Sequence, residues 1–252
     1  MNQILRDHYD DKYKEESNRS LSRMVAAKPI PTDRFQACLY YFPKYFRSGK
    51  ILEVAAGSGI TARDLASQGI DFEQYMVTEA SKTRLDGLKR ELKDKRFVFE
   101  ELDLETLSFN RLELYDAIIT IALIEHLVDP LSAMKRIRLL LKPGGFVYLD
   151  TPNIAKYTRR LKLLFGKFPS TASQDEGLQT YLGKPVTLYD EGHLHYFTFR
   201  SLSRLLVEHC GFSKVIKLGY HSGNAFLGET LMHKLACYWP KMFSELAIIA
   251  YA

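Results

Sequence analysis

The sequence of 252 residues has few cysteines, no long apolar run and only a small excess of charge. Its three cysteines, Cys38, Cys210 and Cys237, are widely spaced and odd in number. This pattern excludes a disulfide framework and a CxxC metal site, and it favours a reducing, cytoplasmic compartment. No stretch approaches the roughly 18 consecutive apolar residues of a membrane span. The first residues, MNQILRDHYDDKYKEE, contain no apolar run typical of a secretory signal.

The net charge is +5, from 35 basic and 30 acidic residues. So small an excess of positive charge is compatible with an anionic substrate. It does not favour binding of nucleic acid, because proteins that bind nucleic acid usually carry a larger and clustered positive charge. The hydrophobic fraction of 46% is that of an ordinary packed domain and excludes a disordered chain.

From residue 50 onward, short apolar runs alternate with stretches of helical pattern. We expect strands at residues 51–55, 74–80, 96–103, 115–123, 146–153 and 212–220, and a seventh at 245–252. This β-α-β-α alternation predicts an α/β fold with one doubly wound, mostly parallel seven-stranded sheet and helices on both faces.

A glycine-rich turn, Glu53-Val-Ala-Ala-Gly57-Ser-Gly59, follows the first expected strand. Glycines let the backbone approach a ligand closely, and the next helix offers free N–H groups. The segment from Gly57 to Ala62 matches G-x-G-x-x-A of dinucleotide sites, which alone is a weak signal. Glu53 favours a cationic ligand group instead, because a carboxylate there would repel a pyrophosphate. The alternative is a turn that binds no ligand.

Two further carboxylates end the next strands. Glu79 lies 20 residues past Gly59, from where it can accept hydrogen bonds from both hydroxyls of a ribose. Asp103 could accept a hydrogen bond from the exocyclic amine of an adenine, beside the backbone of Leu104. The alternatives are a solvated loop glutamate and an aspartate that merely belongs to an acidic segment.

In this order the motifs resemble those of class I S-adenosylmethionine-dependent methyltransferases. The pieces are ILEVAAGSG, the strand that ends at Glu79, LDLE, YDAIITIALIEH and LLKPGGFVYLDTPN, together about residues 50–153. The motifs and their order are most similar to those of the ubiquinone-type and polysaccharide-cluster small-molecule O-methyltransferases. In that subgroup TPN, an insert and an HxHxFT-like segment recur.

The resemblance implies S-adenosyl-L-methionine as the cofactor. Glu53 would face its methionine amino group, Glu79 its ribose, and Asp103 with Leu104 its adenine. Ala55 stands where the family pattern has a glycine, and its methyl group costs little if φ is negative. The full set of expected cofactor contacts is Glu53, Ala55, Gly57, Gly59, Glu79, Ala80, Asp103, Leu104 and Ile121.

Two histidines are the candidates for catalysis. Methyl transfer to a hydroxyl needs alignment of the acceptor and usually a base, and histidine suits this role near neutral pH. His193 and His195 lie in EGHLHYFTF, and in an extended segment they share one face. We favour His193, because the resemblance places a histidine there more often. The alternative for each is a hydrogen bond to the loop or a helix cap.

No metal is predicted. Related ubiquinone-type enzymes carry ExxEH after the fourth strand, and some use it for magnesium. Here the segment is Ala122-Leu-Ile-Glu125-His126. Without the first carboxylate, two adjacent ligands are a poor oxygen-rich cage for magnesium. The segment also lacks an Asn/Asp-Pro-Pro-aromatic motif, which favours an oxygen acceptor over a nucleobase amine.

The whole chain, 1–252, is interpreted as a single domain. It would comprise an N-terminal helical cap at 1–48, a cofactor-binding core at 49–152, an inserted lid at 153–192 and the C-terminal part of the sheet at 193–252. The lid contains the basic segment KYTRRLKLLFGK, which is either a contact for an anionic or lipid-linked acceptor or a peripheral membrane surface, or else a solvated face.

The predicted function is transfer of a methyl group to a hydroxyl of a small molecule, sugar or lipid-linked intermediate. One alternative is a non-catalytic protein of the methyltransferase fold, suggested by Ala55 and Ala122. The other is a NAD-dependent oxidoreductase, suggested by the match from Gly57 to Ala62. The oligomeric state is left open.

Overall fold

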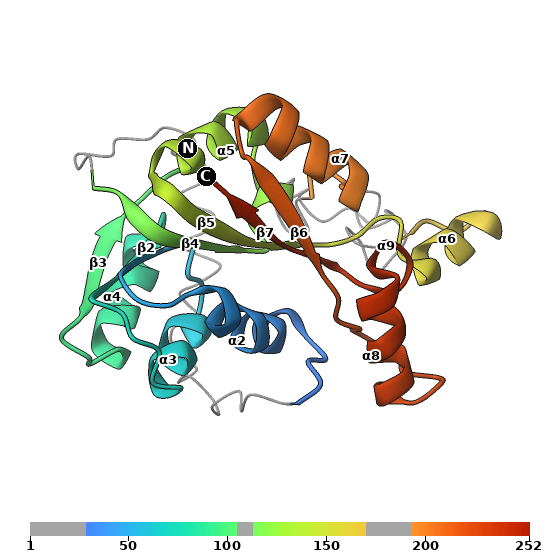
Figure 1. Cartoon of the computed structure of the whole chain (residues 1–252), viewed down its shortest axis with the longest axis horizontal. Coiled ribbons are helices and arrows are strands. Elements are labelled where there is room, and N and C mark those ends of the chain that lie inside the picture. Colours follow the sequence, from blue (N-terminus) through green and yellow to red (C-terminus); the bar gives the residue numbers. More distant parts are fainter. Residues whose placement is uncertain (1–28, 105–112, 170–192) are drawn as a thin grey trace, which may run out of the picture.

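The computed structural model describes residues 29–104, 113–169 and 193–252. These residues form a seven-stranded sheet in the order β3-β2-β1-β4-β5-β7-β6 (Figure 1). The strands are β1 Lys50–Val54, β2 Gln74–Glu79, β3 Phe97–Glu101, β4 Tyr115–Ile121, β5 Leu141–Thr151, β6 Lys214–Leu218 and β7 Leu246–Tyr251. Strands β1 to β5 pair in parallel, and β7 is antiparallel to both β5 and β6. The predicted fold class is confirmed.

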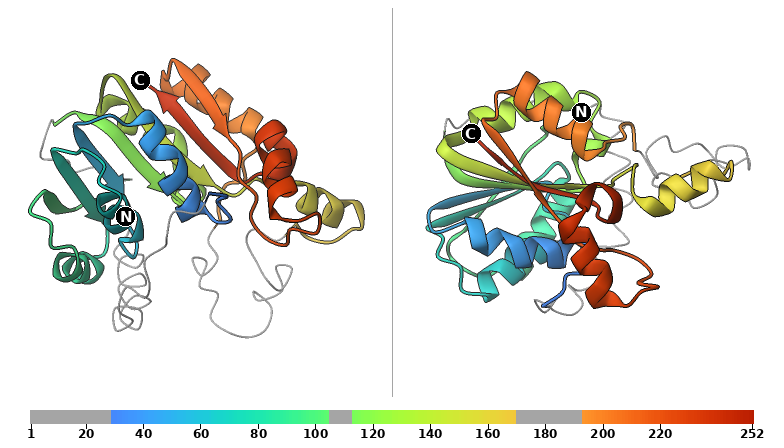
Figure 2. Two further views of the ribbon diagram at one scale, coloured as in Figure 1. Left: turned by 60° about the horizontal axis from the view of Figure 1, so that its bottom comes forward. Right: turned by 45° about the vertical axis from the view of Figure 1, so that its right-hand side comes forward.

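Helices cover both faces of this sheet (Figure 2). The helices of the described residues are α2 Arg34–Tyr45, α3 Ile60–Ser67, α4 Lys82–Glu91, α5 Pro130–Leu139, α6 Tyr157–Leu164, α7 Phe199–Arg204, α8 Glu229–Tyr238 and α9 Pro240–Phe243. Of these, α6 buries no residue and projects beyond the edge of the sheet (Figure 1). A short 3-10 helix, η1 Ile124–His126, and a π-helical segment, η3 Leu205–His209, complete the described elements. Among the described residues, no helix combines the length and the apolar character needed to cross a membrane.

Local sequence explains where several helices begin. The side chains of Asp33 and Ser81 each accept a hydrogen bond from a backbone N–H in the first turn of α2 and α4. Asp129 does the same for α5, whose first residue is Pro130. One strand begins well before its predicted start, because β5 already begins at Leu141, before the Pro-Gly-Gly segment. Near the end of the chain, Pro240 separates α8 from α9, because proline cannot donate a helical hydrogen bond.

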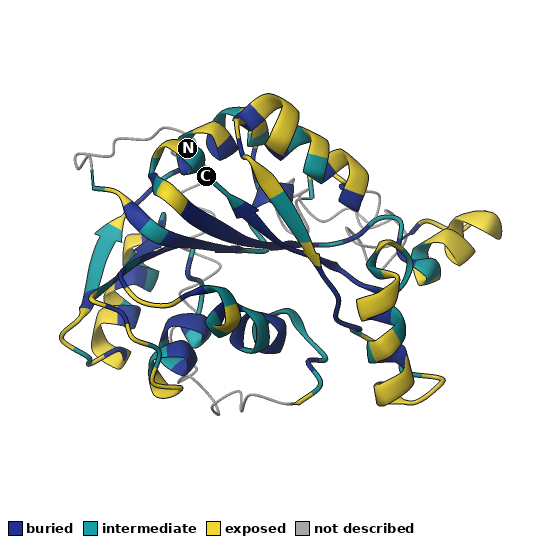
Figure 3. Ribbon diagram, viewed as in Figure 1, coloured by how far each residue is buried: buried dark blue, intermediate teal, exposed yellow. Residues whose placement is uncertain are grey.

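The sheet separates two apolar cores. One lies between the sheet and helices α5 and α7, and the other between the sheet and helices α2, α3 and α4. Figure 3 shows the buried strands between helices whose outer faces are exposed. Phe42 and Phe46 of the aromatic N-terminal segment are buried and stack at 5.2 Å, and Phe42 also packs against Phe146. This aromatic cluster therefore serves packing.

The topology gathers many loops at one edge of the sheet. Because β1 to β5 are parallel, their carboxyl ends share an edge, and β6 ends and β7 begins at this same edge. The order of strands reverses between β1 and β4. In open α/β sheets, ligands bind outside the carboxyl ends of the strands at such a reversal.

The division of the chain into cap, core and lid stays a prediction. Residues 1–28 of the expected cap and 170–192 of the expected lid lie outside the described residues.

Candidate active site

Glu53 is a buried carboxylate near the end of β1, only 3% exposed. Its Oε2 accepts a hydrogen bond of 2.8 Å from the hydroxyl of Tyr75. Burial raises the pKa of Glu53 to about 8, although hydrogen bonds from Tyr75 and Thr61 act in the opposite direction. No ion pair of Glu53 occurs within the described part of the chain. A buried carboxyl of this kind suits a ligand that brings its own positive charge.

The turn after β1 uses the left-handed region of backbone conformation. Gly57 has a φ of 61° and Gly59 of 74°, and a Cβ on Gly59 would lie 2.5 Å from a methyl group of Leu88. Ala55 has a φ of 55°. The expectation that its methyl group costs little depended on a negative φ and is therefore wrong; an L-residue with a side chain is strained here by about 1–2 kcal/mol. Such strain is common at ligand sites.

Glu79 ends β2 directly beside this turn. Its Oε1 accepts a hydrogen bond of 2.5 Å from the N–H of Gly57, and its Oε2 accepts one of 3.2 Å from the N–H of Ala80. Arg84 donates from Nε to the carbonyl of Gly57 at 2.7 Å. Burial raises the pKa of Glu79, and the Arg84 charge opposes this shift. The predicted ribose carboxylate and the glycine turn thus form one hydrogen-bonded unit.

The remaining predicted cofactor contacts lie along the same edge. The N–H of Leu102 donates to the carbonyl of Glu79 at 3.0 Å, which places Asp103 and Leu104 next to the end of β2. Asp103 is half-buried, Leu104 is buried, and Ile121 is half-buried at the end of β4. Among the described residues Glu53 forms no ion pair, a second carboxyl lies on the turn, and the backbone there is in the left-handed region. Together these features fit a ligand with a cationic end and a ribose.

A second cluster follows β4, on the other side of the reversal. The carbonyl of Glu125 accepts hydrogen bonds from the N–H groups of Leu194 and His195, at 2.8 and 3.1 Å. This contact brings His193 beside His126, with ring centroids 4.8 Å apart. One possible ligand atom from each of Glu125, His126 and His193 lies within 4.8 Å of the others.

Two polar atoms in this cluster are buried without a hydrogen-bond partner. They are Oε1 of Glu125 and Nδ1 of His193. Burial, the neighbouring His126 and the charge of Arg34 lower the pKa of His193 to about 4, so its imidazole is neutral at neutral pH. His195 is half-exposed, and its ring lies 6.3 Å from that of Phe197. The structure thus places His193 in the cluster.

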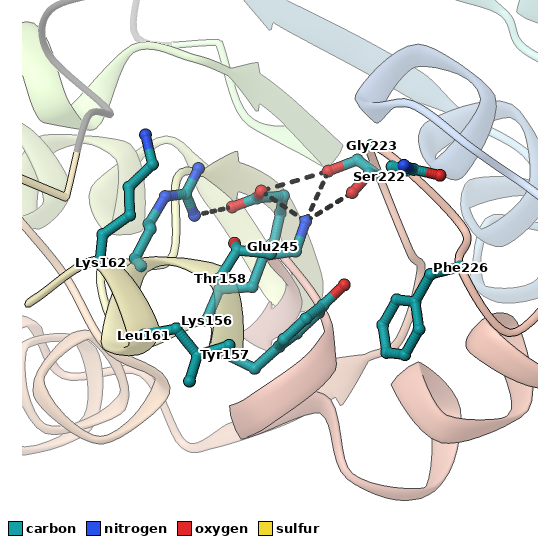
Figure 4. Close-up of a pocket in the computed structure, with 11 residues that line it drawn as sticks. Lys156, Tyr157, Thr158, Leu161, Lys162, Ser222, Gly223, Phe226 and Glu245 are labelled. Atoms are coloured by element: carbon teal, nitrogen blue, oxygen red, sulfur yellow. Dashed lines mark hydrogen bonds and ion pairs between the residues drawn. The ribbon is translucent and has the colours of Figure 1, made fainter. Parts of the chain in front are cut away.

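A pocket of about 590 Å³ lies between α6 and the segment that follows β6 (Figure 4). Lys156 donates from Nζ to both the carbonyl and the hydroxyl of Ser222, and it forms an ion pair of 3.0 Å with Glu245. Arg159 forms a second ion pair with Glu245 at 2.6 Å. Although burial acts to raise it, these two cations hold the pKa of Glu245 at about 2.

The walls of the pocket are partly aromatic. Figure 4 shows the rings of Tyr157 and Phe226 next to each other, with the charged network of Glu245 beside them. Their centroids are 6.0 Å apart. The pocket combines positive charge with an apolar entrance, and it lies at the edge of the sheet that carries the strand-end carboxylates.

Sequence reasoning did not identify Asp150, which is buried near the end of β5. Its Oδ2 accepts a hydrogen bond of 2.7 Å from Tyr220, and Nε of Arg34 lies 3.9 Å from its Oδ1. Burial raises the pKa of Asp150 to about 7. The position of an acid at a strand end could have suggested Asp150, as it suggested Glu79. Its partners come from distant segments and gave no local signal.

Comparisons with known proteins identify the family of this chain. A family model described as a methyltransferase domain matches residues 30–217. Ubiquinone biosynthesis O-methyltransferases of Acinetobacter baumannii (strain AYE) and Leptothrix cholodnii are 30% identical over 106 and 104 residues, which is 41% of this chain and 44% of each relative. The match thus spans less than half the length of these curated relatives.

Solved structures share the fold at low identity. The S-adenosylmethionine-dependent methyltransferase of Mesorhizobium loti has a TM-score of 0.58 at 14% identity, over 86% of this chain and 98% of that one. A possible histamine N-methyltransferase of Thermotoga maritima has a TM-score of 0.57 at 15% identity, over 97% and 98%. Because the family model covers most of it, the chain belongs to the methyltransferase domain family, and its fold is that of the class I methyltransferases.

Proposed function

We propose that this protein is a class I methyltransferase that uses S-adenosyl-L-methionine and transfers its methyl group to a hydroxyl oxygen of a small molecule, a sugar or a lipid-linked intermediate. The observation that carries the proposal is the buried Nδ1 of His193, which has no hydrogen-bond partner and is held beside the buried side chain of Glu125. Such a group can take the proton that a hydroxyl must lose. The names of the ubiquinone O-methyltransferase relatives support an oxygen acceptor.

The strand-end carboxylates would hold the cofactor. We assign the ammonium group of its methionine part to Glu53 and its ribose to Glu79. Adenine is assigned to Asp103 and Leu104. The backbone of the turn with Ala55, Gly57 and Gly59 would lie closest to the cofactor. Ala80 and Ile121 are the remaining proposed contacts. When bound, S-adenosylmethionine supplies a methyl group on a positively charged sulfur, already activated for displacement.

The chain itself then has two tasks, alignment and proton removal. The acceptor oxygen must lie in line with the methyl carbon, because effective displacement depends on this alignment. When bound, the cofactor would supply its methyl group to the acceptor oxygen and leave as S-adenosylhomocysteine. The hydroxyl proton passes to His193, with His195 as the second candidate.

The pocket beside α6 is the proposed binding site for the body of the acceptor. Its volume lies in the range of small-molecule sites. The residues that line the pocket carry an excess of positive charge, with three basic side chains, Lys156, Arg159 and Lys162, and one acid, Glu245. This excess favours an acceptor with a negative group. Peripheral membrane contact through the basic segment and a cytoplasmic location stay predictions.

Calorimetric titration with S-adenosylhomocysteine tests the cofactor site, and binding is expected in the micromolar range. Turnover with labelled methyl donor on a panel of hydroxyl compounds should give a methyl ether, with a preference for anionic members of the panel. His193→Ala should lower kcat, whereas the exposed His209→Ala serves as a control and should not. Absence of binding at high micromolar concentration, or a label found on nitrogen or carbon, would refute the proposal.

A further inference from the structure

The cluster of Glu125, His126 and His193 has the dimensions of a metal site. One carboxylate oxygen and two imidazole nitrogens lie within 4.8 Å of one another. Bonds of 2.0–2.2 Å to a tetrahedral ion separate its ligand atoms by about 3.4 Å. The three atoms therefore need to approach one another by on the order of 1 Å, which small side-chain rotations supply.

Two of the three residues, Glu125 and His193, each have a buried polar atom without a hydrogen-bond partner. Glu125 is 1% exposed, and Thr151 donates to its Oε2 at 2.8 Å while Oε1 has no hydrogen-bond partner. Nδ1 of His193 is likewise buried without a partner. Buried polar atoms are normally satisfied, and an orphan commonly indicates an ion or water that completes the site. The Thr151 hydroxyl fixes the carboxylate in the way that supporting groups orient metal ligands.

The backbone holds the third ligand in place. The carbonyl of Glu125 accepts hydrogen bonds from both Leu194 and His195, so the segment that carries His193 is fixed to the residue that carries the carboxylate. His126 follows Glu125 in the same short turn, η1. The three side chains are thus brought together by two backbone attachments.

We propose that Glu125, His126 and His193 bind one divalent transition-metal ion, such as Zn²⁺, Co²⁺ or Mn²⁺, in preference to Mg²⁺. Two imidazoles and one carboxylate favour such ions, whereas Mg²⁺ prefers oxygen ligands and keeps much of its water. The expectation of no metal weighed only Glu125 and His126, and this proposal replaces it. A carboxylate at position 122 is not required, because His193 supplies the third ligand from a distant segment.

The role of the ion, unlike its binding, rests on the proposed function. A divalent cation beside an acceptor hydroxyl lowers the pKa of that hydroxyl and thereby favours loss of its proton. Because His193 would then hold the ion, the role of proton acceptor would pass to the second candidate, His195.

Metal binding is tested on the full chain, without an affinity tag and stripped with a chelator. Titration with Co²⁺, followed by its visible absorption, and calorimetry with Zn²⁺, Mn²⁺ and Mg²⁺ should show one ion per chain and at least tenfold weaker binding of Mg²⁺. Glu125→Gln and His193→Ala should each weaken binding by tenfold or more. His209→Ala, at an exposed position, should bind as the wild type does.

Absence of stoichiometric binding, equal affinity for Mg²⁺, or variants that bind normally would overturn the proposal. If Glu125→Gln fails to fold by circular dichroism, the half-buried His193→Ala decides the outcome. Titration of the same wild-type samples with S-adenosylhomocysteine separates the two hypotheses. If the wild type binds S-adenosylhomocysteine but no metal ion, the metal site alone is refuted. If it does not bind S-adenosylhomocysteine, the proposed function is refuted.

Discussion

The N–H of Gly57 donates a hydrogen bond of 2.5 Å to Oε1 of Glu79, and so connects the turn after β1 to the end of β2. The N–H of Ala56 also donates to the carbonyl of Thr78 at 2.9 Å. The glycine turn and the strand-end carboxylate are therefore held in one arrangement. This arrangement allows the roles of individual residues to be tested by single substitutions.

Glu79→Ala should weaken the binding of S-adenosylhomocysteine by ten- to a hundredfold. Hydrogen bonds to a charged group contribute about 1.5–3 kcal/mol, and the variant also releases the turn at Gly57. Glu79→Gln, which keeps an acceptor oxygen, should lose less. Glu101 pairs with Glu79 in the sheet register but is exposed, so Glu101→Ala is the matched control. Calorimetry measures all three, and an affinity of Glu79→Ala within twofold of the wild type would show the ribose assignment to be wrong.

The affinity for S-adenosylhomocysteine should rise with pH between 6 and 8. In the free enzyme the pKa of Glu53 is about 8, so the carboxyl is mostly protonated below this value. An ammonium group binds the ionised form, and binding then releases a proton. The affinity therefore increases by up to tenfold per pH unit and levels off near pH 8.

Glu53→Gln provides the control for this pH dependence. It should bind more weakly and with a nearly flat profile, while proton release disappears in calorimetry with buffers of different ionisation enthalpy. The control is needed because the pKa of Asp150, about 7, falls in the same range. A wild-type affinity that does not change from pH 6 to 8 would exclude Glu53 as the partner of the ammonium group.

Ala55→Gly should stabilise the protein by about 0.5–1 kcal/mol and leave cofactor binding intact. The φ of 55° strains an alanine but not a glycine, and relief of this strain exceeds the entropic cost of glycine. The neighbouring Ala56 is buried and is not in the left-handed region, so Ala56→Gly should destabilise instead. Urea denaturation of the two variants gives free energies of unfolding, and the same sign for both would contradict the strain at Ala55.

The fold could be predicted from the sequence because its strands are short apolar runs that end at turn residues. Glu79 and Asp103 could be placed for the same reason, since the ends of parallel strands meet at one edge whatever else surrounds them. The sign of φ at Ala55 could not be predicted, because a small residue after a strand is compatible with either conformation.

The cluster around Glu125 lay beyond the reach of local patterns. His193 joins it through hydrogen bonds between the carbonyl of Glu125 and a segment far along the chain. No periodicity encodes such a contact, and the absence of a carboxylate at position 122 argued against a metal. The pairing of Asp150 with Tyr220 is long-range in the same way. The sequence therefore identifies these residues one by one, but it does not show which of them lie together in the folded chain.

Replacement of Glu245 tests the charged network behind the pocket. Glu245→Ala should lower the free energy of unfolding by about 3–5 kcal/mol, because it leaves the ammonium of Lys156, a residue only 3% exposed, buried without its counter-ion. The control is Lys142→Ala, which breaks a more exposed ion pair with Asp116 and should cost at most about 1 kcal/mol. Equal losses in the two variants, measured by urea denaturation, would mean that the network is no more important than a surface pair.

The same network predicts how the wild type responds to acid. The pKa of Glu245 falls from its ordinary value of 4.5 in the unfolded chain to about 2 in the folded protein. Its contribution to stability is therefore fully present above about pH 4.5 and is lost as the pH falls toward 2. Glu245→Gln removes this titration, so its free energy of unfolding should change less between pH 5 and pH 3 than that of the wild type. Parallel curves for the two proteins would show that the Lys156 and Arg159 ion pairs do not depress this pKa.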